Sequence, residues 1–265
     1  CAISGHADTQ INGATLLSGN AIEGGLIIAR TAPKAIITLD GAGIPVTPDG
    51  LFVIGFHRDS DLPVIIHIAK VDGTSKRTML KPQQRTYEVQ HINGLKQAMV
   101  TPPDSVIKRI KSDQAAVAAA RQILAPPGDF WQGFDWPVTG PISGVFGSQR
   151  ILNGQPRQPH YGIDIAAPTG TPVYAPASGL VTLVKDLYFS GWTVVIAHGL
   201  GVNSTFLHFD QVDVKTGMMV ERGALIGKIG ATGRATGPHL DWRIDWQGRR
   251  IDPGLLVGAM PDPAS

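Results

Sequence analysis

Short apolar runs separated by turn residues dominate this 265-residue chain, and only one segment has the pattern of a long helix. The chain contains 32 glycines and 20 prolines, which favour turns and short strands over long helices. Apolar residues make up 43% of the chain and charged residues 17%, so a packed core is feasible. The sequence therefore predicts a fold dominated by β-strands, with enough residues for one large or two ordinary domains.

The first half of the chain predicts a small β-sandwich. Turn signals such as Asp40-Gly41 and Asp72-Gly73 separate its β-rich runs at the intervals that are typical of antiparallel sandwiches. We expect an immunoglobulin-like β-sandwich over residues 13–102. The runs that predict its strands are 25–30, 35–39, 51–56, 64–69 and 86–92.

A helix is predicted to connect the two halves. Val106, Ile110, Val117 and Ile123 form part of an apolar face within 104–124, and a Pro-Pro-Gly run at 126–128 ends the pattern. We therefore predict a helical linker over residues 103–128. Short strands and glycine turns return beyond it, so residues 129–265 are expected to form a second domain, built on an antiparallel sheet.

Charge and hydropathy exclude some functions and leave one question open at Cys1. The formal net charge is only +2 and the cations are scattered, so we expect no nucleic-acid partner. No apolar stretch approaches the roughly 18 residues that span a bilayer. Cys1 is the only cysteine, and two explanations remain open for it. It is either the lipid-bearing first residue of a mature bacterial lipoprotein or a boundary that falls there by coincidence.

Histidines and aspartates in the second half have the pattern of a metal site. His160 and Asp164 bracket a short hydrophobic step, and His208 lies in a strand-like run. His239 and Asp241 are two residues apart, so in a strand both side chains point to the same face. These imidazole and carboxylate groups suit a zinc ion with three protein ligands and an open position for water. Metal-assisted hydrolysis is therefore the leading hypothesis.

Several motifs follow one another in the second half in an order that is typical of one enzyme family. They are GVFG (144–147), HYGIDIAAP (160–168), GTPVYAPA (170–177), VVIAHG (194–199), FLH (206–208), GKIG (227–230) and TGRATGPHL (232–240). From about residue 141 to 253 the chain resembles the lysostaphin/LytM-type zinc metallopeptidases, which cut peptide cross-links of bacterial peptidoglycan. The resemblance implies a compact all-β peptidase domain with a groove over an antiparallel sheet.

The resemblance also implies roles for individual residues. His160 and Asp164 match the first two zinc ligands of the family. His208 and His239 match the histidines that orient the attacking water or stabilise the oxyanion.

The third zinc ligand of the family is the second histidine of a His-x-His motif, and this chain has Asp241 in its place. Aspartate oxygen is an ordinary zinc ligand, so we predict bound zinc held by His160, Asp164 and Asp241. The alternative is that Asp241 is a surface carboxylate paired with Arg243.

Three functional hypotheses follow. The first is a zinc metalloendopeptidase that hydrolyses peptidoglycan stem peptides or cross-links, in the periplasm or cell envelope and lipid-anchored if Cys1 is modified. The second is a module with a degenerate metal site that binds peptidoglycan or activates another hydrolase. The third gives the main role to the N-terminal domain, as an adhesion or docking unit for an envelope protein. Metal content discriminates the first two.

Overall fold

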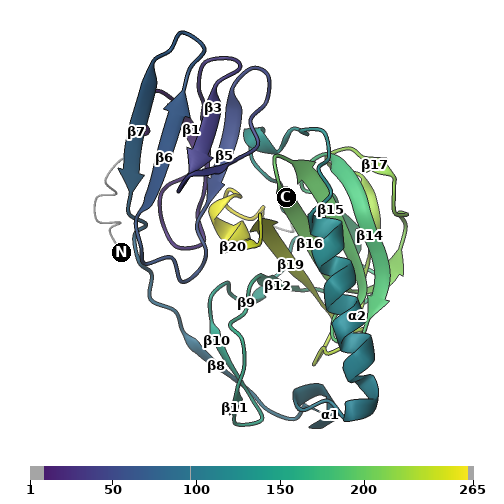
Figure 1. Ribbon diagram of the computed structural model, residues 1–265. Coiled ribbons are helices and arrows are strands. Elements are labelled where there is room, and N and C mark those ends of the chain that lie inside the picture. Colours follow the sequence, from purple (N-terminus) through teal and green to yellow (C-terminus); the bar gives the residue numbers. More distant parts are fainter. Residues whose placement is uncertain (1–8, 96, 262–265) are drawn as a thin grey trace. The chain divides into compact units, whose positions relative to one another are not determined.

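The computed structural model describes residues 9–95 and 97–261, and Cys1 lies outside these described ranges. The chain divides into two compact units, Cys1–Arg85 and Thr86–Ser265. Both units consist mainly of strands (Figure 1), so the predicted β-dominated fold is confirmed. Within the described ranges, no helix is long and apolar enough to cross a membrane.

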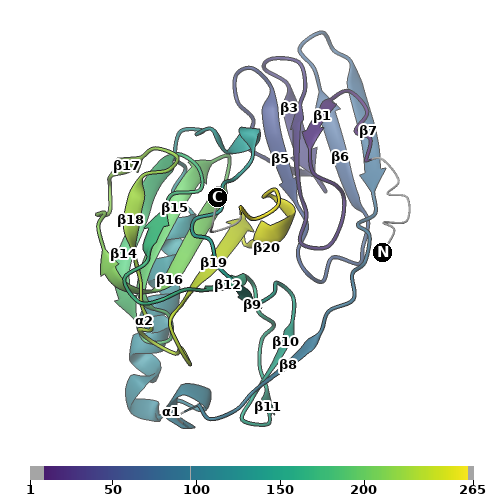
Figure 2. The same cartoon turned by 180° about the vertical axis from the view of Figure 1, so that it is seen from behind.

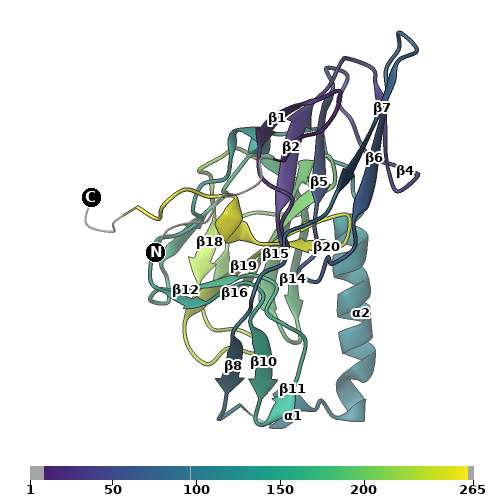
Figure 3. The same cartoon turned by 90° about the vertical axis from the view of Figure 1, so that its left-hand side faces the viewer.

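The first unit consists of two antiparallel sheets, which Figure 3 shows as two layers. One sheet has the order β1 (Thr15–Ser18), β2 (Leu26–Arg30), β5 (Leu51–Gly55). The other has the order β4 (Ala42–Gly43), β3 (Ile36–Leu39), β6 (Val64–Ala69), β7 (Ser75–Leu80). Both sheets contribute buried apolar side chains, among them Ile28 and Val53 from one and Ile37 and Ile66 from the other. The two-sheet architecture matches the expected sandwich, while its immunoglobulin-like character stays a prediction.

Four of the five strands predicted for this unit are present at close to the expected positions, as β2, β3, β5 and β6. The sequence did not reveal β7, which contains the exposed residues Lys76 and Arg77. This strand lies at the edge of its sheet, where charged residues are common and the apolar pattern is weak. The fifth predicted strand, 86–92, is observed only as β8 (Val89–Ile92).

The second unit begins earlier than the predicted peptidase domain, at Thr86, because β8 and the helix belong to it. Strand β8 pairs in parallel with β10 (Gln149–Leu152), which pairs with β11 (Gln155–Pro156). The short helix α1 (Gln97–Val100) precedes α2 (Asp104–Arg121), which contacts β14 (Gly179–Leu187) and β15 (Gly191–Gly199). The helix therefore packs on the sheet of the second unit and is more than a linker.

The main sheet of the second unit is antiparallel, and Figure 2 shows it with α2 on its far side. Strand β18 (Leu225–Ile229) pairs with β13 (Pro172–Tyr174) and with β16 (Val202–Val212). Strand β20 (Arg249–Ile251) pairs with β19 (His239–Trp246). Short 3-10 turns occupy Phe130–Gln132 and Pro253–Leu255. The main path follows the order β17 (Met219–Val220), β14 (Gly179–Leu187), β15 (Gly191–Gly199), β16 (Val202–Val212), β19 (His239–Trp246), β12 (Ile163–Ala166) and β9 (Ile142–Gly144).

His198 is a structural residue of this sheet, as expected from its position at a strand end. Its side chain is fully buried, Nδ1 donates to the Ser178 carbonyl at 2.9 Å, and Nε2 lies 2.8 Å from the Ser204 hydroxyl. Burial lowers the pKa of His198 to about 4. Since a histidine in the unfolded chain binds a proton near pH 6.5, stability that is present at neutral pH is lost as the pH falls from 6.5 towards 4.

We expect His198 to account for about 2 kcal/mol of stability lost between pH 7 and pH 5. Urea unfolding of the wild type and of a His198→Asn variant at both pH values measures the part of the loss in unfolding free energy that is due to His198. The loss should be smaller in the variant by that amount. An equal loss in both proteins would contradict the assignment.

Candidate metal centre

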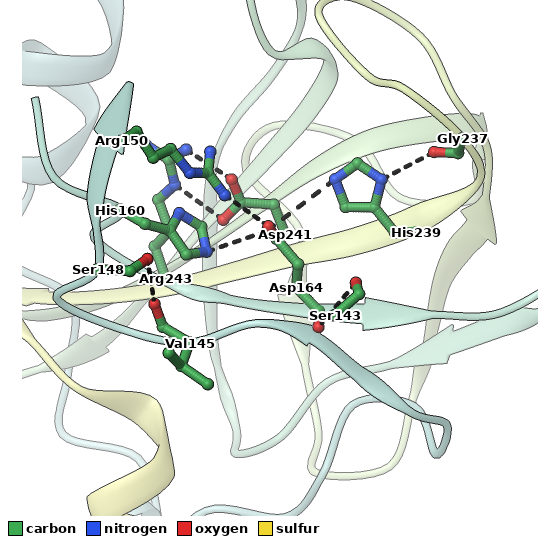
Figure 4. Close-up of polar contacts among 10 residues, drawn as sticks. All are labelled: Ser143, Val145, Ser148, Arg150, His160, Asp164, Gly237, His239, Asp241 and Arg243. Carbon is green, nitrogen blue, oxygen red and sulfur yellow. Dashed lines mark hydrogen bonds and ion pairs between the residues drawn. The ribbon is translucent and has the colours of Figure 1, made fainter. Parts of the chain in front are cut away.

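Two neighbouring strands bring Asp164 and Asp241 together. Strands β12 and β19 pair antiparallel with these two aspartates directly opposite each other, and both side chains are buried. His160 lies just before β12 and is also buried. Potential ligand atoms of the three residues all lie within 4.8 Å of one another, and the close-up in Figure 4 shows the side chains converging. The structure therefore assembles the predicted set of three ligands.

Unpaired polar atoms in this cluster fit a metal ion. The Nε2 atom of His160 lies 3.0 Å from Oδ1 of Asp164, but the pair lacks hydrogen-bond geometry. Both ring nitrogens of His160 and Oδ1 of Asp164 are buried without a hydrogen-bond partner among the described residues. Burying such atoms unpaired is costly. A tetrahedral zinc ion places its ligand atoms about 3.4 Å apart, so a nitrogen and two carboxylate oxygens within 4.8 Å suit it.

Two arginines compensate the paired carboxylates. Arg150 on β10 donates to Oδ2 of Asp164 at 2.6 Å, and Arg243 donates to both oxygens of Asp241, at 2.9 and 2.5 Å. Burial opposes ionisation of Asp241, but Arg243 and His160 outweigh it and hold its pKa well below the usual range. Two carboxylates thus face two guanidinium groups. The negative charge of Asp241 is compensated by Arg243.

Asp164 is ionised for a similar reason. Burial and the neighbouring Asp241 carboxylate raise its pKa, but the nearby His160 and Arg150 outweigh them, so the net direction is downward. Its Oδ2 atom is held by Arg150 while Oδ1 remains available to a ligand. The arginine therefore orients this carboxylate as well as compensating its charge.

Two glycines of the sequence motifs make room for the carboxylates. A Cβ atom on Gly144 would lie 2.3 Å from Oδ2 of Asp164. A Cβ atom on Gly162 would lie 2.6 Å from both Oδ1 of Asp241 and Cγ of Arg243. Any other residue at either position would displace a candidate ligand. This explains in physical terms why the motifs have glycine at these two positions.

A β-bulge aims His208 into the site. Between the pairs Trp192–Phe209 and Val194–Phe206, two residues of β16 oppose one residue of β15. His208 is one of the two and has a φ of 68°, in the left-handed region. Because Leu207 pairs with Asp241, regular alternation would turn His208 to the opposite face. The bulge instead brings its ring centroid within 4.8 Å of that of His239.

The backbone fixes the tautomers of both imidazoles. Nδ1 of His208 lies 2.7 Å from the Thr232 carbonyl, and Nδ1 of His239 lies 2.8 Å from the Gly237 carbonyl. A carbonyl only accepts, so each Nδ1 carries the hydrogen and each neutral ring keeps a lone pair on Nε2. Burial lowers the pKa of His208 to about 4, so this ring is neutral at pH 7.

A narrow cleft of about 60 Å³ adjoins these groups. Asp164, His208 and His239 line it together with Arg150. Apolar side chains from the β8 side, Ile92 among them, form part of its wall. The cleft gives the candidate ligand Asp164 and the two imidazoles a common space for a reacting group.

All five site residues predicted from the sequence lie in this region. Asp241 combines features of both alternatives, because it belongs to the ligand cluster and also pairs with Arg243. The view of it as a surface carboxylate was wrong, since its side chain is buried. The sequence reasoning missed Arg150, which lies outside the quoted motifs and reaches the site only because β10 folds next to it.

Comparison with known proteins identifies the family. Residues 158–253 match the model of Peptidase family M23. A crystal structure described as a peptidase M23 from Pseudomonas aeruginosa superposes with a TM-score of 0.72 and 30% identity, over 92% of this chain and 97% of that one. The chain therefore belongs to peptidase family M23, and the predicted resemblance to lysostaphin/LytM-type peptidases is confirmed.

Two curated relatives each match a part of the chain. The peptidoglycan DD-endopeptidase ShyA of Vibrio cholerae is 43% identical over 94 residues, which are 36% of this chain and 22% of the relative. The DD-carboxypeptidase/endopeptidase Mpg of Neisseria meningitidis is 39% identical over 104 residues, 39% of this chain and 24% of the relative. The matches thus span about a quarter of the length of these curated relatives.

Proposed function

We propose that this protein is a zinc metalloendopeptidase that hydrolyses peptide bonds in the stem peptides or cross-links of bacterial peptidoglycan. The observation that carries the proposal is the buried cluster of His160, Asp164 and Asp241 beside two imidazoles, in which the His160 nitrogens and Oδ1 of Asp164 have no hydrogen-bond partner among the described residues. The names of ShyA and Mpg support the substrate class. We also propose that the protein acts in the periplasm or cell envelope, where this substrate occurs.

His160, Asp164 and Asp241 would hold the metal ion, with Arg150 and Arg243 fixing the two carboxylates. Zinc in such a site polarises a carbonyl and lowers the pKa of a bound water. An open fourth position is what distinguishes a catalytic zinc site from a structural one. One nitrogen and two oxygens from these residues would supply the three protein ligands of such a site.

The two imidazoles divide the proton handling. His239 Nε2 lies 4.0 Å from Oδ1 of Asp164, beside the candidate metal position, where it would accept the proton of the attacking water and pass it to the leaving amine. His208 stays neutral, and its Nε2 atom would accept a hydrogen bond from the attacking water. This hydrogen bond would orient the water. The carbonyls of Thr232 and Gly237 keep both rings in the tautomer that these roles need.

Digestion of purified peptidoglycan sacculi tests the proposed activity. The zinc-loaded protein should convert cross-linked muropeptides into uncross-linked ones, as chromatography of the products would show. Chelation of the metal should stop the reaction and added zinc should restore it. Sacculi that remain fully cross-linked under all conditions would argue for a module that only binds peptidoglycan.

Metal content tests the ligand set directly. We expect about one zinc per chain in the wild type and a loss of most of it in Asp241→Ala, since removing one of three ligands leaves only two. Elemental analysis after dialysis against metal-free buffer measures this. An Asp213→Ala variant, which changes an exposed aspartate of the same unit, should keep its zinc. Zinc retained in Asp241→Ala would mean that Asp241 is not a ligand.

A further inference from the structure

A second cavity lies between helix α2 and the sheet. It has a volume of about 370 Å³, within the usual range of small-ligand sites. Helix α2 lies along the strands β14 to β16 in two views (Figures 1 and 3). Asp113 accepts a hydrogen bond from the Tyr188 amide, and Arg121 donates to the Thr205 hydroxyl at 2.9 Å. Polar contacts thus hold α2 to the sheet at Asp113 and at Arg121. Ala118, which lies between these two residues in the helix, lines the cavity.

Three arginines line this cavity. Arg121, Arg243 and Arg250 all line it. Arg121 lies 2.7 Å from Asp245, and Arg243 is paired with Asp241. These three guanidinium groups therefore have two carboxylate partners, and Asp113, which also lines the cavity, is paired separately with Lys185 at 3.3 Å.

Arg250 carries the surplus charge. The described residues hold no carboxylate within ion-pair distance of it, and its buried Nη1 atom has no hydrogen-bond partner among them. Its guanidinium lies 5.6 Å from the Tyr161 ring centroid. A buried donor without a partner is costly, so this atom favours a ligand that supplies an acceptor.

Apolar side chains also line the cavity. Ile110 and Val117 of α2 contribute to it, and so do Leu187 and Leu207 of the sheet. An aliphatic chain that ends in a carboxylate would match both the apolar side chains and the arginines of this lining. Short acidic peptides offer such side chains, whereas a polyanion would find too few cations here.

The cavity adjoins the metal centre through Arg243. This side chain lines the cavity, and its guanidinium group also donates to the candidate ligand Asp241. We propose that the cavity is a subsite that binds a carboxylate-bearing residue of the peptide substrate, with Arg250 as its main charged donor. This inference rests on the proposed function, since it specifies which part of an acidic stem peptide the enzyme recognises.

Binding of a peptide that has no cleavable cross-link tests the subsite apart from catalysis. The probe is the stem tripeptide L-Ala-γ-D-Glu-meso-diaminopimelate, compared by calorimetry with the same tripeptide fully amidated. The wild type should bind the free acid about 10- to 100-fold more tightly. Arg250→Gln should remove this preference, and Arg250→Lys should keep part of it.

Arg249→Gln is the matched control. Arg249 is the preceding residue of β20 and lies over the Trp246 ring, so the same charge change there should leave the preference intact. Ala118→Phe offers a second test at an exposed position on the cavity wall and should weaken binding by filling the space. An undiminished preference in both Arg250→Gln and Ala118→Phe would overturn the subsite, as would equal binding of both peptides by the wild type.

Failure of the subsite and failure of the proposed function give different results. Cleavage of sacculi with no selective tripeptide binding would remove the subsite and keep the peptidase. Selective binding that depends on Arg250, in a protein that cleaves no sacculi, would keep the subsite and remove the peptidase.

Discussion

A His160→Ala variant is expected to lose bound zinc and at least about 10³-fold in the rate of cross-link cleavage. Metal ions stabilise such transition states by several kcal/mol, which corresponds to a loss of this size. His160 is the one nitrogen donor of the cluster, and its ring is buried with both nitrogens unpaired. No hydrogen bond among the described residues accounts for that burial, which fits the ligand role that we propose for the ring.

Initial rates of muropeptide release, together with zinc content, measure this effect. His67→Ala is a suitable control, because His67 lies on β6 in the first unit. It should keep both the zinc and the rate. A His160→Ala protein with full zinc and an unchanged rate would contradict the assignment of the metal centre.

The residues of the metal centre could be predicted from the sequence because the family motifs place each of them in a recognisable segment. His160, Asp164 and His239 follow from the order of these segments, and two-residue alternation along a strand puts His239 and Asp241 on one face. The strand register that sets Asp164 opposite Asp241 then follows from the fold.

Other features could not be predicted, because they depend on contacts between distant segments. The bulge at His208 has no sequence signature, and alternation alone would have turned this histidine away from the site. Arg150 reaches Asp164 from a separate small sheet. That sheet also contains β8, so a strand expected in the sandwich belongs to the second unit. The apolar pattern identified the strand but carried no information about its partner.

The pairing of Asp241 with Arg243 shows how the chain accommodates an aspartate where the family has a histidine. Like charges directly opposite each other on a sheet are destabilising, and Asp241 faces Asp164 across β12 and β19. Arg243 lies two residues further along the same strand and the same face, within reach of both Asp241 oxygens. The substitution is therefore best understood as an Asp-x-Arg unit that holds a buried carboxylate beside His160 and Asp164.

An Arg243→Met variant is expected to destabilise the metal-free protein by about 3 kcal/mol, because it leaves the buried Asp241 carboxylate without its ion-pair partner. Urea unfolding in the presence of a chelator measures this loss. Zinc should restore part of the stability, since the ion supplies positive charge to the same carboxylate. Arg249→Met, which changes an arginine over the Trp246 ring, should have a much smaller effect.

The double variant Asp241→Asn/Arg243→Met separates charge compensation from packing. If Arg243 acts by compensating the carboxylate, removing that charge as well should recover most of the stability lost in Arg243→Met. Additive losses in the double variant would instead mean that Arg243 stabilises the sheet through its stem. Recovery of stability without recovery of zinc binding is the expected combination, because the neutral amide at 241 no longer offers the anionic ligand that the site requires.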